Sequence, residues 1–190
     1  MHEFPKWLVA TLASDATEGQ GVLPNFILPL QANSRVIGPA HVALMSRDDN
    51  LAMRKVMDAQ PTPGTVLVVG GGGMSRTAAI GDLLALELQN AGIAGLVTDG
   101  LVRDSQEIRQ LGFGVWCRGV TPMASHKNGP ARVGGSISIG GIVIQDGDLV
   151  IADDDGVVIW PQEQIDTLLI RAEAKLQQDN RRLAQLQEKR

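Results

Sequence analysis

The pattern of hydrophobic and polar positions first indicates strands in the middle of the chain. Segment 65–69 is continuously apolar and β-branched between glycines, which predicts a strand buried on both faces. Segment 95–98 predicts a second short strand of the same kind, and the loose alternation over 36–45 predicts a third. These segments predict the centre of a sheet.

Segments with helical spacing of their apolar residues separate these strands. Four helices are predicted before residue 122: over 5–18, over 48–60, from the glycines of 70–73 to Gly92, and from Asp104 or Ser105 onward. Asp48 or Asp49 would cap the second of them. The resulting order of strand, helix, strand and helix is the signature of a parallel α/β layer.

The helix that follows the glycine run has two candidate starts. If Ser75 caps it, Asp82 lies two turns inside the helix. If it begins near Gly81, the backbone N–H groups of Asp82, Leu83 and Leu84 are free at the edge of the sheet. A glycine inside a helix costs about 1 kcal/mol relative to alanine, which favours the later start.

The chain changes character after Pro122. Short apolar or alternating segments predict strands at 136–139, 142–144, 149–151 and 157–160. Asp-Gly turns at 145–148 and 153–156 separate them, and such turns between apolar runs indicate hairpins. The second half of the domain is therefore predicted to be antiparallel β packed beside the α/β half.

Residues 161–190 predict a long C-terminal helix. Its apolar residues follow a spacing close to a heptad: Ile165, Leu169, Ala172, Leu176, Leu183 and Leu186. Asp179 is the polar residue in the one gap. The first half is expected to lie on its own domain, which spans 1–160, and the polar second half to contact a neighbouring subunit.

Composition narrows the class of protein. The chain has 190 residues, a net charge of −4 and only 3% aromatic residues, so a nucleic-acid partner is not expected. Its single cysteine, Cys117, forms no internal disulfide and has the apolar neighbours of a packed residue. The sequence has neither a signal-peptide layout nor an apolar run of membrane-spanning length. A soluble cytoplasmic protein is the expectation.

Candidate chemistry gathers after two of the predicted strands. Loops that leave parallel strands meet at the carboxyl edge of a sheet, so Asp82 and the pair Arg103–Asp104 can converge there. A helix N-terminus and an arginine both favour a carboxylate ligand. The two aspartates add hard oxygen ligands that suit Mg²⁺ or Mn²⁺, whereas no His/Cys cluster has the spacing of a zinc site.

Each of these residues also has a simpler interpretation. Asp104 could be only a helix cap, and Arg103 could pair with Asp104 or Asp99 at the surface. Asp82 could simply favour a helix dipole. From the residues alone, the sequence predicts an anion site, with or without a metal.

Other polar motifs are given no functional role. The glycines of 70–73 lack the ending of a nucleotide-binding loop and predict close backbone packing instead. The acidic run 153–155 ends at a glycine and indicates a turn. His41 and His126 have no partner in the sequence for a catalytic triad.

Two motifs in this chain resemble those of a known family. Gly81-Asp82-Leu83-Leu84, followed by Asp99-Gly100-x-x-Arg103-Asp104-x-x-Glu107, is similar to the 4-hydroxy-4-methyl-2-oxoglutarate aldolases, a family that includes the regulator of ribonuclease activity A. The aldolase members carry an Asp, twenty residues and then Arg-Asp, and the interval from Asp82 to Arg103 matches. The similarity extends through 36–40, 111–116 and 146–158, so it covers nearly the whole chain.

The resemblance implies a layered β/β/α domain of the swivelling type that forms homotrimers or hexamers, with active sites at subunit boundaries. In this arrangement Asp104 would ligate Mg²⁺ or Mn²⁺, and Arg103 would hold the keto oxygen that becomes an enolate. The backbone amides of Gly81, Asp82, Leu83 and Leu84 would bind the substrate carboxylate, and Asp82 would also orient a water at the metal. A neighbour's helix would add an acid at the position of Asp179, where the family has glutamate.

The resemblance also implies the activity. A 4-hydroxy-2-oxo acid would be cleaved to pyruvate and a carbonyl product, and oxaloacetate would be decarboxylated through the same enolate. The alternative is a non-catalytic protein that binds and inhibits a ribonuclease, but such members lack the complete Asp–Arg–Asp set, and this sequence retains Asp82. A methyltransferase is a third class, for which the sequence shows no cofactor-binding motif.

Overall fold

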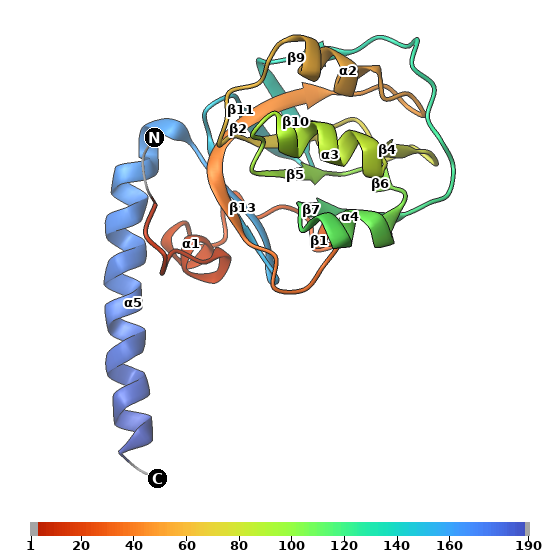
Figure 1. Ribbon diagram of the computed structural model, residues 1–190. Helices are drawn as coiled ribbons and strands as arrows, with labels where there is room; N and C mark the ends of the chain where they lie inside the picture. The colour runs from red at the N-terminus through yellow and green to blue at the C-terminus, as the bar shows by residue number, and fades with distance from the viewer. Residues whose placement is uncertain (1–3, 189–190) are drawn as a thin grey trace.

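A computed structural model describes residues 4–188, and a mixed β-sheet forms its centre (Figure 1). In spatial order the strands of this sheet are β1 (Leu28–Pro29), β7 (Gly114–Cys117), β5 (Gly95–Thr98), β3 (Val66–Gly70), β2 (Val36–Leu44), β12 (Leu149–Asp153) and β13 (Gly156–Trp160). A further short strand, β9 (Arg132–Val133), pairs with β2. The central strands β2, β3 and β5 run parallel, as the sequence predicts, and β7, which the sequence pattern did not predict, continues this parallel order.

Helices cover one face of this sheet. The helices of the chain are α1 (Ala10–Ala16), α2 (Leu51–Asp58), α3 (Asp82–Asn90), α4 (Ser105–Leu111) and α5 (Ile165–Gln187), the last preceded by a 3₁₀ turn (Gln162–Gln164). Side chains of α2, α3 and α4 pack with Leu67, Val69 and Leu96 of the sheet into one apolar cluster. Cys117 belongs to this cluster, as expected, and burial raises the pKa of its thiol.

A β-hairpin covers the opposite face. It consists of β10 (Ser136–Ile139) and β11 (Ile142–Gln145), and its residues Ile137, Ile139 and Ile144 are buried against the sheet. All five residues of β3 are buried, because hairpin and helices cover its two faces. Hairpin, sheet and helices together form the predicted β/β/α layers.

The antiparallel half continues the central sheet. Strand β12 pairs with β2 on one side and with β13 on the other, both antiparallel. The predicted turn over 153–156 joins β12 to β13, and α1 and α5 cover this end of the sheet. The antiparallel prediction is confirmed, and the β12–β13 pair lies in the same sheet as the parallel strands.

Two predicted helix starts are wrong. The first helix begins at Ala10, where the backbone N–H donates to a carboxylate oxygen of Asp153 at 2.8 Å. The second begins at Leu51 with Asn50, rather than Asp48 or Asp49, in the cap position, although Asp49 Oδ1 accepts the N–H of Leu51 at 2.9 Å. Both carboxylates accept backbone N–H groups from distant loops, and these contacts could not be predicted from local spacing.

The C-terminal helix leaves the body of the protein (Figure 1). Its first half packs on α1, and Ala172 is its last buried residue. Residues 180–188 are all exposed in the single chain. Within the described residues, no helix combines the length and apolar content needed to cross a membrane.

Candidate functional site

A second, smaller sheet positions the candidate residues. It contains three parallel strands, β4 (Ala78–Ile80), β6 (Leu101–Val102) and β8 (Gly119–Val120), none of which the sequence pattern predicted. Gly81 follows the end of β4 and Arg103 follows the end of β6. The backbone N–H of Arg103 donates to the carbonyl of Ile80 at 3.0 Å. The carboxyl ends of these short strands, rather than those of β3 and β5, therefore bring the two motifs together.

Helix α3 begins at this edge. Gly81 has extended backbone angles and occupies the cap position, and Asp82 is the first helical residue. The later of the two candidate starts is therefore confirmed. Because the first N–H groups of a helix have no intrahelical acceptor, those of Leu83 and Leu84 are available to an anion.

A side chain at position 81 would displace the side chains of Asp104 and Arg103. A Cβ atom there would collide with a carboxylate oxygen of Asp104 and would lie 3.0 Å from Nε of Arg103. The φ of Gly81 is −124°, an ordinary value for any residue, so the role of glycine here is to leave space for these two side chains. The close approach of Arg103 and Asp104 to α3 depends on this missing side chain.

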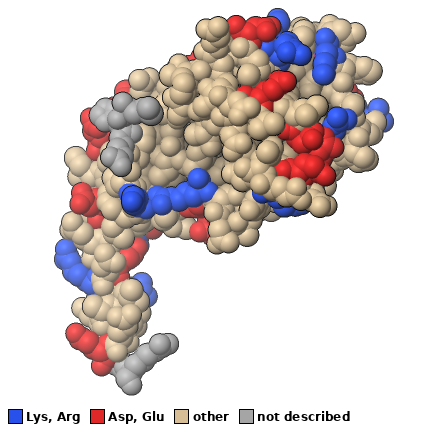
Figure 2. Space-filling view, in the orientation of Figure 1, with Lys and Arg blue, Asp and Glu red and all other residues tan. Residues whose placement is uncertain are grey.

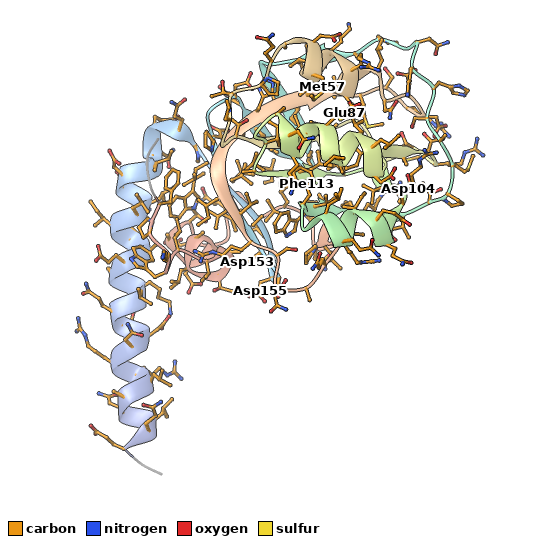
Figure 3. The ribbon with its side chains drawn as sticks, viewed as in Figure 1. Met57, Glu87, Asp104, Phe113, Asp153 and Asp155 are labelled. Atoms are coloured by element: carbon orange, nitrogen blue, oxygen red, sulfur yellow. The ribbon has the colours of Figure 1, made fainter. Side chains whose placement is uncertain are left out.

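Asp104 adopts a left-handed backbone conformation, with φ of 51°, that is uncommon outside glycine. Its Oδ2 lies 3.4 Å from the backbone nitrogen of Asp82 and 3.2 Å from Nε of Arg103. Asp104 occupies the cap position of α4 but makes no side-chain cap bond, so the simple capping interpretation is wrong. Figure 3 shows Asp104 where α4 begins. The carboxylate instead joins α3 to Arg103.

Within residues 4–188, no side-chain hydrogen bond or ion pair occupies the terminal nitrogens of Arg103. Its Nε binds Asp104, and the side chain of Arg103 is 41% exposed. Of the two surface partners considered for Arg103, the structure selects Asp104 and not Asp99. An arginine anchored through Nε presents its two terminal NH₂ groups as a fork for a carboxylate or keto oxygen.

These residues line a cavity of about 220 Å³. All five residues predicted to bind substrate contribute to its wall: Gly81, Asp82, Leu83, Leu84 and Arg103. Asp104 lies directly behind Arg103. The opposite wall includes Asn50, Ser125 and Lys127, which sequence reasoning did not assign. They follow no motif or periodicity, so no local signal could have identified them.

Buried polar groups fix this opposite wall. Asp49 is 5% exposed, and its carboxylate accepts the N–H groups of Leu51, Asn128 and Gly129 at 2.7–2.9 Å. Burial works to raise the pKa of Asp49, but the three backbone N–H groups outweigh it and lower that pKa. Ser125 Oγ donates to the carbonyl of Ala78 at 2.8 Å. The segment that carries Lys127 is thereby tied to both α2 and β4.

The glycine run closes over Asp99. The N–H of Gly72 donates to Asp99 Oδ1 at 2.8 Å, and a Cβ on Gly72 would lie 2.6 Å from Cα of Gly100. The predicted close backbone packing is confirmed. Burial raises the pKa of Asp99, and the N–H groups of the glycines and nearby Arg118 only partly oppose it. Asp99 therefore anchors a loop behind the site.

The donor set suits a hard divalent cation. Asp82 lines the cavity, and the Asp104 carboxylate lies beside it against the Asp82 backbone nitrogen. Mg²⁺ sites with one or two carboxylates keep several waters. Among the described residues, no group of three or more His, Cys, Asp or Glu side chains gathers as a metal cage. The residues present fit a cation that is held partly by substrate and water.

The other polar motifs lie apart from this cavity. His41 lies on the interior strand β2, and its Nδ1 is 3.3 Å from Asp146 Oδ1. The acidic run 153–155 forms a turn, and Asp153 uses its carboxylate for the N–H groups of Ala10 and Asp155. Neither histidine lines the cavity, so neither gains a role.

Fold and site together define a layered α/β protein with a small anion-sized cavity between a helix N-terminus and an arginine. Residues 10–159 match the model of the RraA-like family, described as Aldolase/RraA. The chain belongs to this family.

Named relatives carry two kinds of description. A protein of Halalkalibacterium halodurans, named "Putative 4-hydroxy-4-methyl-2-oxoglutarate aldolase", is 38% identical over 90% of this chain and 81% of its own. The crystal structure of Streptomyces coelicolor RraAS2, titled an unusual member of the RNase ES inhibitor RraA protein family, superposes with a TM-score of 0.83 at 29% identity, covering 94% of this chain and 93% of its own. RraA from Thermus thermophilis, titled an RNA-processing inhibitor, gives 0.73 at 31% identity, covering 85% and 94%.

Replacing Asp49 tests how the cavity wall is held. Asp49→Ala leaves three backbone donors without their acceptor and is expected to destabilise the protein by about 2–3 kcal/mol. Because the folded-state pKa of Asp49 is lowered, its contribution is complete above the ordinary aspartate pKa and is lost as pH falls through the folded value. The difference in melting temperature between wild type and variant should therefore shrink in acid.

Asp58→Ala is the matched control, because Asp58 is an exposed acid at the other end of α2, the helix that Asp49 precedes. It should change stability by less than about 0.5 kcal/mol. Equal melting temperatures for the two variants would contradict the anchoring role of Asp49.

Proposed function

We propose that this protein is a divalent-metal-dependent lyase that cleaves 4-hydroxy-2-oxo acids to pyruvate and a carbonyl product. The observation that carries the proposal is the convergence of Arg103 and the first turn of α3 on one cavity, with Asp104 bonded to both. A 2-oxo acid presents a carboxylate and a keto oxygen on adjacent carbons. The carboxylate suits the helix N–H groups, and the keto oxygen suits the arginine fork.

Binding orients the bond that breaks. The substrate carboxylate accepts N–H groups of the Gly81–Leu84 segment, and the keto oxygen faces the terminal nitrogens of Arg103. Mg²⁺ or Mn²⁺, held by Asp104 with Asp82 nearby, would supply Lewis-acid polarisation of the substrate oxygens. Arg103 then stabilises the negative charge that develops on the keto oxygen.

The cleavage step balances in atoms and electrons without another reactant. Asp82 orients the water that takes the proton from the C4 hydroxyl, and C4 becomes a carbonyl carbon. The electron pair of the C3–C4 bond forms the C2–C3 double bond of the pyruvate enolate, and protonation at C3 gives pyruvate. Oxaloacetate can lose carbon dioxide through the same enolate, so decarboxylation is included in the proposal.

The second candidate is a non-catalytic protein that binds and inhibits a ribonuclease. The titles of the two solved RraA relatives favour it. The site residues favour the lyase, because the Asp82, Arg103 and Asp104 set is complete and borders one cavity. An assay of pyruvate release from 4-hydroxy-2-oxo acids separates the two candidates, since the ribonuclease-binding function requires no product.

Metal removal tests the cation requirement. Dialysis against EDTA is expected to abolish pyruvate release, and added Mg²⁺ or Mn²⁺ should restore it, because two carboxylates and one arginine cannot by themselves polarise both substrate oxygens. Full turnover in the presence of chelator would refute the metal dependence.

Substitution of Arg103 tests the catalytic assignment. Arg103→Ala removes the positive charge opposite the forming enolate. It should raise the activation free energy by about 3 kcal/mol and so lower turnover roughly a hundredfold. Arg103→Lys should recover little, since a point charge does not reproduce the fork. Arg171→Ala, at an exposed arginine on α5, is the control and should keep full turnover.

Thermal melting distinguishes catalysis from stability in these variants. Arg103 is partly exposed, so its removal should leave the melting temperature nearly unchanged. Near-wild-type turnover in Arg103→Ala would end the case for this residue, and a large loss of stability would explain inactivity by unfolding.

We also propose that the free half of α5 contacts another copy of the chain in a homotrimer or hexamer. Leu183 and Leu186 are more than half exposed there. Asp179 accepts a hydrogen bond from Lys175 Nζ at 2.6 Å, and the same Nζ lies 3.5 Å from an oxygen of Asp15. Asp179, together with Asp15, raises the pKa of Lys175. Helix α5 lies on the opposite side of the body from β4 and β6, so Asp179 can approach only another copy's site (Figure 1).

Deleting 180–190 tests the assembly. Because none of residues 180–188 is buried in the single chain, the truncated protein should fold. Light scattering should nevertheless give fewer copies per particle than for the full chain. An unchanged number of copies per particle would refute a role for this segment in assembly.

A further inference from the structure

Asp48 lies outside the cavity and connects three segments that form its walls. It follows β2 and precedes α2, and it does not line the cavity. Its backbone adopts the left-handed conformation, with φ of 56°, which is uncommon for a residue with a side chain. In this conformation its N–H, its carbonyl and its carboxylate each bind a different partner.

Two of these groups bind the segment that leads into β4. The N–H of Asp48 donates to Ser75 Oγ at 2.9 Å, and Ser75 is 2% exposed. The N–H of Arg76 donates to Asp48 Oδ1 at 2.6 Å, and the N–H of Thr77 donates to the same oxygen at 3.3 Å. Strand β4 begins at the next residue, Ala78, which lines the cavity. Asp48 therefore fixes the start of the strand that leads to α3.

The third group binds the opposite wall of the cavity. The N–H of His126 donates to the carbonyl of Asp48 at 2.9 Å, and the N–H of Asn50 donates to the carbonyl of His126 at 2.9 Å. Ser125 and Lys127, on either side of His126, line the cavity, as does Asn50. Figure 1 shows the segment that leads into β9 passing beside β4 and α2. Each of these wall residues lies within two positions of Asp48 or of a residue that it binds.

A pair of hydroxyl groups joins the two walls. Thr77 is 5% exposed, and its Oγ1 lies 2.6 Å from Ser125 Oγ. Ser125 has a single hydroxyl hydrogen and donates it to the carbonyl of Ala78 at 2.8 Å, so Thr77 is the donor in the pair. Because the Thr77 hydrogen is used in this way, the Asp48 carboxylate relies on backbone N–H groups.

The ionised form of the carboxylate suits this junction. The N–H of Arg76 is the main cause that lowers the pKa of Asp48, and burial opposes it only in part. Nε of Arg47 lies 3.7 Å from Asp48 Oδ2, but the arginine side chain is 65% exposed, so this ion pair contributes little to stability. Figure 2 shows basic side chains over the adjoining α2 as well, so the surroundings of the carboxylate favour its charged form.

We propose that Asp48 is a positioning residue for the lyase reaction, because it holds the wall opposite Arg103 in place relative to β4. The inference rests on the proposed lyase function and adds to it a residue outside the cavity. Arg103 and the first turn of α3 are held separately by Asp104. Loss of the Asp48 contacts should therefore loosen the opposite wall and leave the arginine in place. A displacement of about 1 Å in a reacting geometry can cost roughly a hundredfold in rate.

Substitution by glycine and by asparagine tests this role. Asp48→Gly tolerates the left-handed backbone but removes the carboxylate. It should lower kcat/KM for pyruvate release from 4-hydroxy-2-oxo acids about tenfold, with a higher KM, because a fixed wall no longer confines the substrate. Asp48→Asn keeps an oxygen that can accept the N–H of Arg76 and tolerates the same backbone conformation, so it should recover most of the activity.

A second variant loosens the same wall without changing Asp48. Thr77→Val keeps the shape of the side chain but removes the hydroxyl that binds Ser125, so it should raise KM by a smaller factor. Gln60→Gly is the matched control, because Gln60 also has a left-handed backbone, with φ of 52°, and is exposed outside the cavity. It should keep the kcat and KM of wild type.

Kinetics of the folded variants separate positioning from stability. Each variant is assayed well below its melting temperature, and hydrogen exchange follows the N–H groups of Arg76 and His126. Faster exchange of these N–H groups together with a higher KM supports the proposal. A loss of kcat that only follows the unfolded fraction, at unchanged KM, contradicts it. If Asp48→Gly does not fold, Thr77→Val decides, and an unchanged KM in that variant contradicts the proposal.

The outcomes separate the two proposals. If wild type releases pyruvate and folded Asp48→Gly keeps its kcat and KM, the role of Asp48 is refuted and the lyase proposal stands. If wild type releases pyruvate from no 4-hydroxy-2-oxo acid and not from oxaloacetate, the lyase proposal itself fails, and the positioning role of Asp48 fails with it.

Discussion

The missing side chain at position 81 is the constraint on which the site depends. Gly81 lies between the end of β4 and the start of α3, and a Cβ there would collide with the carboxylate of Asp104. Because that space is empty, Asp104 reaches the Asp82 N–H and holds Nε of Arg103 at the same time. One glycine therefore allows a cation, a carboxylate and a helix N-terminus to share one end of a small cavity.

The charge balance of this cluster fits the proposed chemistry. Asp82, Asp104 and Arg103 carry a net charge of −1, and a divalent cation would change the sign to positive. In the proposed reaction, such a site would attract a 2-oxo acid more strongly with the cation present, and the dipole of α3 would add to that attraction. Binding of metal and of substrate should then be coupled through electrostatics.

Carboxylates hold the irregular segments around the cavity, whereas α3 forms its regular wall. Asp49 fixes the segment that follows residue 127, and Asp99 fixes the glycine loop through backbone N–H groups. Each carboxylate satisfies donors that would otherwise be unpaired in a poorly solvated position. This arrangement keeps irregular segments rigid enough to line a site.

The sequence by itself determined the parallel strands, the antiparallel second half, the long C-terminal helix and the start of α3. Continuous apolar runs indicate strands that are buried on both faces. The free-energy cost of a glycine inside a helix favoured the later of the two candidate starts of α3. The motif residues from Gly81 to Leu84 and the pair Arg103–Asp104 were also identified, and they do line or border one cavity.

Only the tertiary structure decided how these residues meet and what faces them. Strands β4, β6 and β8 are two or three residues long, too short for a hydrophobic period, so their pairing could not be predicted. Asn50, Ser125 and Lys127 enter the cavity through loops that are tied down by hydrogen bonds to residues far away in the chain. The spacing of residues along the chain cannot predict such contacts, because they form only when separate elements pack against one another.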